Sequence, residues 1–143
     1  MLLSERKRKI LKRLRSNGKL RIEQAEQWAN YLLNRFPELR AWSCVVDYSR
    51  QDEWVGLCYY ETSTILLDWR HVLRDPDFEV KDTILHEIAH ALVKDEPEEH
   101  GPLWEAKALE IGVSYKEICR YRYASVEDAE IVAESGCKWM LPG

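Results

Sequence analysis

The sequence His-Glu-Ile-Ala-His at residues 86–90 constrains the fold of this chain more than any other feature. An α-helix turns about 100° per residue, so His86 and His90 lie about 40° apart on one helix face. Two imidazoles placed in this way can reach one metal ion, and Glu87 on the flank of that face can deprotonate a water molecule. The apolar residues of this segment fall on the opposite face: Ile84, Leu85, Ile88, Leu92 and Val93. We therefore expect a helix with an apolar back in the core and a metal-binding front that faces a cleft.

A catalytic zinc ion needs three protein ligands and one open position, so this motif leaves one ligand to be found. His100 is the best candidate, because Pro102 suits the first turn of a second helix over residues 103–111 and leaves His100 at its mouth. Glu105 and Glu110 in that helix are the alternative ligands. The acidic residues before it, Glu96, Glu98 and Glu99, are interpreted as a solvated turn. The alternative interpretation is that the paired histidines are ordinary surface or hydrogen-bonded core residues.

The segments around these histidines resemble the SprT-like metalloprotease family, which includes the Spartan-type DNA–protein crosslink proteases. The resemblance rests on residues 83–92 and on His-Gly-Pro-Leu-Trp with the helix that follows, residues 100–112. It implies a small zincin-like α+β domain in which His86, His90 and His100 bind zinc and Glu87 is the catalytic base. It also implies a protein substrate, with DNA-associated or DNA-crosslinked proteins as the class to consider.

The cysteines depart from the family pattern. Many family members end in a zinc ribbon built from CxxC pairs, whereas Cys44, Cys58, Cys119 and Cys137 are isolated. We therefore expect one zinc site and reduced thiols, as in a cytoplasmic, nucleoid or nuclear setting. The sequence shows neither an apolar secretion signal after its basic start nor the run of about 20 apolar residues that a membrane span needs.

Positive charge is concentrated at the N-terminus. The net charge is −4, but residues 1–21 contain nine Lys or Arg and one acid, which leaves 12 basic and 24 acidic residues elsewhere. Apolar residues recur there near helical spacing: Leu3, Ile10, Leu11 and Leu14. The pattern predicts a basic amphipathic helix that is broken at Asn17-Gly18. Three partners fit such a helix: nucleic-acid phosphates, an anionic membrane surface, or the acidic body of the protein itself.

The remaining pattern predicts an α+β fold with one core, as 143 residues and 45% hydrophobic content suggest. We divide it into a basic N-terminal helix, residues 1–20, and a metalloprotease domain, residues 21–143. A helix is expected over residues 22–36, and the active-site helix is expected to start near Glu79. Short strands are expected at residues 42–48, 55–60 and 64–68, in an antiparallel meander. Residues 116–123 are read as a short helix or extended arm, and residues 126–135 as a helix.

The expected chemistry is metal-assisted peptide hydrolysis, with the substrate lying as an added strand along the edge of the sheet. The residues able to donate to the oxyanion are Tyr59, Tyr60, Tyr115, Tyr121, Tyr123, Arg120 and Arg122, and spacing does not choose among them. The main alternative is a non-proteolytic zinc-containing module that binds DNA or acts as an adaptor. A zinc hydrolase that acts on a small amide is a third possibility.

Overall fold

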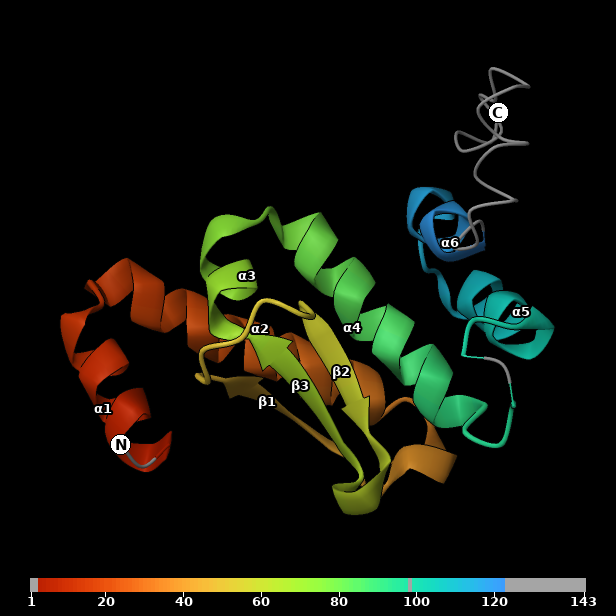
Figure 1. The fold of residues 1–143 in the computed structure, drawn as a ribbon, viewed down its shortest axis with the longest axis horizontal. Coiled ribbons are helices and arrows are strands. Elements are labelled where there is room, and N and C mark those ends of the chain that lie inside the picture. The colour runs from red at the N-terminus through yellow and green to blue at the C-terminus, as the bar shows by residue number, and fades with distance from the viewer. Residues whose placement is uncertain (1–2, 98, 123–143) are drawn as a thin grey trace.

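The computed structural model describes residues 3–97 and 99–122, which form a three-stranded sheet and six α-helices (Figure 1). The helices are α1 (Leu3–Arg13), α2 (Ser16–Leu33), α3 (Trp69–Arg74), α4 (Asp77–Leu92), α5 (Pro102–Ile111) and α6 (Tyr115–Arg122). The strands are β1 (Ser43–Asp47), β2 (Gly56–Tyr59) and β3 (Thr64–Asp68), with short 3-10 turns η1 (Pro37–Leu39) and η2 (Tyr60–Thr62). The mixed α+β class predicted from the sequence is confirmed.

The sheet is mixed, so the predicted antiparallel meander is wrong. Its order is β1-β3-β2, with β3 parallel to β1 and antiparallel to β2. The third strand is the most apolar, with Ile65 and Leu67 fully buried, and such a strand is stabilised most at the centre of a sheet. The chain therefore crosses from β1 to the opposite edge, forms β2 there and returns through a hairpin. This order leaves β2 as an edge strand beside α4.

One face of the sheet is covered by α2 and α4. Burial alternates along β1, with Cys44 and Val46 buried and their neighbours more exposed, and these two residues pair with Ile65 and Leu67 of β3. The resulting apolar row forms one core with residues of both helices, which also pack against each other. From α4 this core receives the fully buried Ile84 and Ile88 together with Leu92, whereas Leu85 and Val93, which were predicted on the same face, pack against a second cluster formed with α5 and α6. The other face of α4 is thereby turned toward β2 and the later helices.

The N-terminal helix docks on this core. Its apolar residues Ile10 and Leu11, with Leu14 just beyond its end, pack against this core, and Arg6 Nε donates to the carbonyl of Tyr48 at 2.6 Å. The helix break lies at residues 14–15, because α2 begins at Ser16, so its predicted position at Asn17-Gly18 is wrong. The division into residues 1–20 and 21–143 stays a prediction.

Helix boundaries near the site follow local sequence signals. Pro102 occupies the first turn of α5, and Gly112 ends it with φ of 101°, a left-handed conformation that glycine adopts without strain. Residues 116–122 lie in a helix, as one of the two readings predicted, whereas the predicted helix at 126–135 lies outside the described residues. Within the described part of the chain, no helix is long and apolar enough to cross a membrane.

Gly56 allows β2 to approach α4 closely, which yields a prediction. A Cβ at this position would lie 2.5 Å from Cγ2 of Thr83 and 3.3 Å from Cγ of Glu87. We expect Gly56→Ala to lower the free energy of unfolding by about 1–3 kcal/mol, because the Thr83 side chain or the strand must shift to admit the methyl group. Urea unfolding in the presence of a metal chelator measures this change. Gly18→Ala is the matched control, since a Cβ there meets no atom closer than 3.6 Å. Equal stabilities of the two variants would contradict the close approach.

Candidate metal centre

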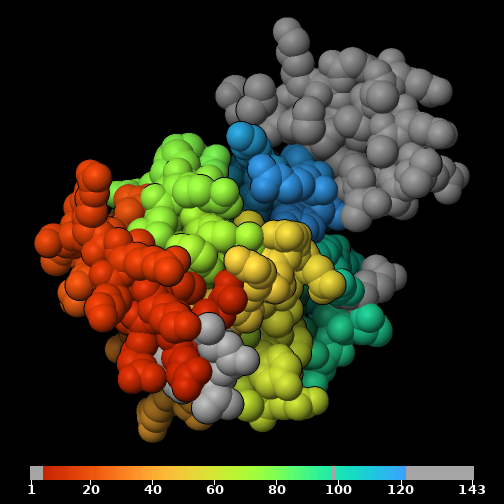
Figure 2. Space-filling model, turned by 60° about the vertical axis from the view of Figure 1, so that its left-hand side comes forward, coloured from red at the N-terminus to blue at the C-terminus, as the bar shows by residue number. Residues whose placement is uncertain are grey.

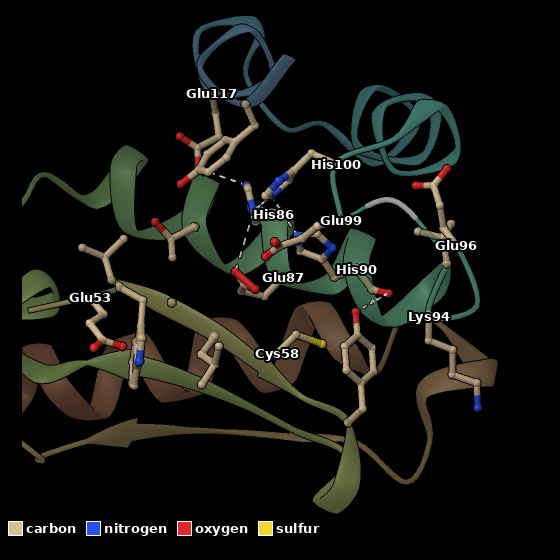
Figure 3. Close-up of a pocket in the computed structure, with 18 of the residues that line it drawn as sticks. Glu53, Cys58, His86, Glu87, His90, Lys94, Glu96, Glu99, His100 and Glu117 are labelled. Carbon is tan, nitrogen blue, oxygen red and sulfur yellow. Dashed lines mark hydrogen bonds and ion pairs between the residues drawn. The ribbon is translucent and has the colours of Figure 1, made fainter. Parts of the chain in front are cut away.

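Three histidines from two segments point at one another above β2 (Figure 3). His86 and His90 come from α4, one turn apart, and His100 comes from the loop that precedes α5. Nε2 of His100 lies 3.1 Å from Nε2 of His86 and 3.1 Å from Nε2 of His90. Two nitrogens bound to one tetrahedral zinc at about 2.05 Å would be about 3.3 Å apart. The group therefore has the spacing of a zinc site.

Aromatic rings fix the orientation of these imidazoles. The buried Trp104 donates its indole N–H to the carbonyl of His86 at 3.2 Å, and its ring stacks on His90 with centroids 5.5 Å apart. Tyr121 of α6 stacks on His100 at 4.3 Å and meets His86 edge-on at 4.5 Å. Trp104 and Tyr121 thus form two aromatic walls beside the histidines. Packing of this kind limits ring rotation and preorganises the nitrogens.

Burial keeps two of the imidazoles neutral. Desolvation, followed by repulsion from the neighbouring histidines, lowers the pKa of His90 to about 3 and that of His100 to about 4. A neutral imidazole has one nitrogen with a free lone pair, which is the form that binds a metal. The donor set therefore fits a divalent cation of borderline softness such as zinc.

Glu87 lies beside the histidines and is not part of their group. Its Oε2 is 3.8 Å from Nε2 of His86, and its side chain is buried against Gly56 of β2. Burial raises the pKa of Glu87 to about 7, while the adjacent His86 opposes this shift. A carboxyl with such a pKa exchanges protons readily near neutral pH, which is the property that a general base requires.

Glu96 was missed by the sequence analysis, which placed it in a solvated turn. Its carboxylate accepts the backbone N–H groups of Leu103 at 2.6 Å and Trp104 at 2.9 Å, and so caps the first turn of α5. Since His100 lies between Glu96 and α5, this cap closes the loop that carries it. The position of Glu96 shortly before α5 could have suggested the cap, because acidic side chains favour helix N-termini. Glu98 lies outside the described residues.

Glu117 of α6 was also missed. Its Oε2 lies 3.2 Å from Nδ1 of His86, at hydrogen-bonding distance but outside the angular range of a well-formed bond. Its Oε1 is 3.1 Å from Arg120. Burial opposes ionisation of Glu117, but these contacts outweigh burial and lower its pKa. No sequence signal marks this residue, because it meets His86 only through the packing of α6 on α4.

The other predicted candidates separate in space. The alternative ligands Glu105 and Glu110 are not among the metal-ligating groups that the described residues bring together, and Glu110 pairs with Lys107 at 2.7 Å. The fourth histidine, His71, contacts Asp75 and Thr83 elsewhere in the fold. Within the described residues, no disulfide joins Cys44, Cys58 and Cys119.

A cleft of about 540 Å³ lies in front of the histidines. Its floor includes Gly56, Leu57 and Cys58 of β2. Among the candidate oxyanion donors with described side chains, Tyr60 and Tyr121 line it. The Tyr60 hydroxyl already donates to the carbonyl of His90 at 3.3 Å. The cleft therefore combines a metal-ligating group, a buried acid and an edge strand.

The comparisons with known proteins agree with this geometry. The model of the SprT-like family matches residues 22–124, which is most of the chain. The matched segment contains all three histidines, Glu87 and Glu117. Searches of curated proteins and of solved structures found no match.

The cap on α5 generates a prediction about its stability. We expect Glu96→Ala to lower the free energy of unfolding by about 1 kcal/mol, because two backbone N–H groups lose their acceptor. We also expect weaker binding of a metal ion by the three histidines, because His100 is then held less firmly. Chelator competition and urea unfolding measure the two effects. Asp95→Ala is the control, since this exposed neighbour caps nothing in the described structure. A variant at Glu96 that matched the control in both measurements would contradict the assigned role.

Proposed function

Because the chain belongs to the SprT-like family, we propose that it is a zinc-dependent metalloendopeptidase. In this proposal His86, His90 and His100 hold the ion, and Glu87 is the general base. The observation that carries it is the convergence of three imidazole nitrogens next to a buried carboxyl in a cleft. A base next to a metal site with an open position serves hydrolysis, whereas a structural zinc needs no such group.

In the proposed reaction, the metal ion and Glu87 have separate roles. Zinc, when bound, supplies Lewis acidity that makes water nucleophilic near neutral pH and polarises the scissile carbonyl. Glu87 accepts the proton of the attacking water and then delivers it to the leaving amine. Its burial between α4 and β2 excludes bulk water, so the proton stays at the reacting atoms.

An extended peptide is the substrate that the cleft accommodates best. As an edge strand, β2 has one side without a strand partner, and three of its residues line the cleft. A peptide added beside β2 would satisfy its backbone hydrogen bonds and bring a scissile carbonyl in front of the histidines. Since recognition would then run through the backbone, we expect broad sequence tolerance. This substrate class also fits proteins that are associated with or crosslinked to DNA.

The catalytic proposal is tested first by metal content and hydrolysis. We expect one zinc per chain and a large loss of zinc in each of His86→Ala, His90→Ala and His100→Ala. Glu87→Gln should keep the zinc and the fold but abolish cleavage of an unstructured protein, because it removes the proton acceptor alone. Metal analysis and a gel-based cleavage assay provide the two readouts.

The competing functions give different outcomes in the same assays. A non-proteolytic zinc-containing DNA-binding or adaptor module would bind zinc but cleave nothing as wild type. A hydrolase of small amides would cleave a dipeptide but spare an unstructured protein. Turnover by Glu87→Gln at the wild-type rate would show that the base is another residue.

DNA binding through α1 is a second proposal, favoured by the orientation of its charges. While its apolar stripe packs on the core, the cations Lys7, Arg8, Lys9, Lys12 and Arg13 are exposed. Figure 2 shows α1, in red, as an open surface on one side of the molecule. None of these cations pairs with an acid within residues 3–97 and 99–122. DNA phosphates could therefore bind these cations without breaking an ion pair inside the protein.

The DNA proposal is tested by neutralising charges and leaving the helix in place. If Lys9, Lys12 and Arg13 contact phosphates, changing all three to Gln should reduce the log–log salt slope of duplex binding by about 2–3, at about 0.9 per contact. Salt-dependent binding isotherms measure this slope. Changing Arg35, Arg40 and Arg50 to Gln is the matched control, because these exposed arginines lie outside α1. Equal slopes for both triple variants, or no binding by wild type, would exclude α1 as the DNA contact.

A further inference from the structure

Two side chains hold the start of α6 against the active-site helix. Asp82 of α4 accepts the backbone N–H of Ser114 at 2.7 Å and also its hydroxyl. The Ser114 hydroxyl oxygen in turn accepts the backbone N–H of Glu117 at 3.2 Å. Asp82 lies four residues before His86, so this anchor stands one helical turn from the metal-ligating face. The anchor therefore sets the position of Glu117 relative to His86.

The carboxylate of Glu117 is placed where an isolated charge would be costly. The residue is 8% exposed, and its two oxygens face different partners, His86 and Arg120. Arg120 is itself 57% exposed, so it contacts the carboxylate from the solvent side. The inner carboxylate oxygen, Oε2, therefore faces the imidazole of His86. Burying a carboxylate in this way is unfavourable unless each of its two oxygens contacts a hydrogen-bond donor or a cation.

Nδ1 of His86 needs a proton acceptor. If Nε2 is to face the other two histidines with a free lone pair, the imidazole proton must reside on Nδ1. This nitrogen is buried and makes no well-formed hydrogen bond within the described residues, and Glu117 is the acid that approaches it, at 3.2 Å. Ligating histidines commonly donate their other N–H to a carboxylate, which fixes the tautomer and the ring orientation.

We propose that Glu117 is a positioning residue for the metal centre, which accepts the Nδ1 proton of His86 and so directs the Nε2 lone pair at the ion. This inference rests on the proposed function, because it assumes that His86 is a metal ligand. Glu117 contacts neither the substrate nor the reacting water in this assignment. It acts through His86 alone.

The test compares Glu117→Gln with Arg120→Ala. Glutamine has the same shape, but Arg120 attracts the amide oxygen, so the amide nitrogen faces Nδ1 and favours the wrong tautomer. We expect about 10- to 100-fold weaker zinc binding in chelator competition. In Arg120→Ala the carboxylate remains, so zinc affinity should stay within about twofold of wild type. If Glu117 acted only through its ion pair with Arg120, both variants would lose zinc affinity to the same extent. That result would contradict the inference.

A second readout uses the metal-free protein. Imidazole ¹⁵N resonances distinguish the tautomers, and we expect the Nδ1–H form of His86 in wild type and in Arg120→Ala, but the Nε2–H form in Glu117→Gln. An unchanged tautomer together with unchanged zinc affinity in Glu117→Gln overturns the inference. If wild type bound no zinc, the proposed function would fail, while the resonances would still decide whether Glu117 sets the tautomer.

Discussion

The arrangement of this molecule depends on the burial of a polar helix face. On α4, His86, Glu87 and His90 are 4–7% exposed, although each carries groups that water would otherwise solvate. Burying such groups costs several kcal/mol unless they find partners, at roughly 1–3 kcal/mol for each unsatisfied group. The apolar back of the helix provides the opposing free energy by packing in the core between α2 and the sheet. The site can therefore exist only if later segments cover the polar face with matching groups.

Acidic side chains organise that cover. Glu96 caps α5, which presents Trp104 to the imidazoles, and Asp82 anchors the start of α6, which presents Glu117 and Tyr121. An anion at a helix N-terminus interacts favourably with unpaired N–H groups and with the helix dipole. Each cap thus positions a helix whose residues then enclose the histidines. On the remaining side, Gly56 lets β2 approach closely enough to form the cleft floor.

The sequence predicted the features that local spacing determines. The histidine pair on one helix face, the proline at the start of α5 and the glycine at its end are all signals within a few residues, and the structure places them as expected. The strand order could not be derived in this way, because β1 and β3 pair across the whole β2 hairpin. Contacts between distant segments, such as Glu117 with His86, leave no local pattern either. The break after α1 was misplaced because Asn17 and Gly18 favour turns, yet both are accommodated in the first turn of α2.

The N-terminal helix shows how packing and charge can be separated on one element. Its sequence fits three partners: nucleic-acid phosphates, an anionic membrane surface and the acidic body of the protein itself. Docking uses the inner stripe with Ile10 and Leu11, along with Arg6 on the Tyr48 carbonyl, whereas the exposed lysines and arginines face outward. The body outside residues 1–21 has a net charge of −12, so it attracts the cationic helix at long range and favours docking. Docking removes few of the outward charges, and the same helix can therefore be fixed to the body while it presents a cationic surface to a polyanion.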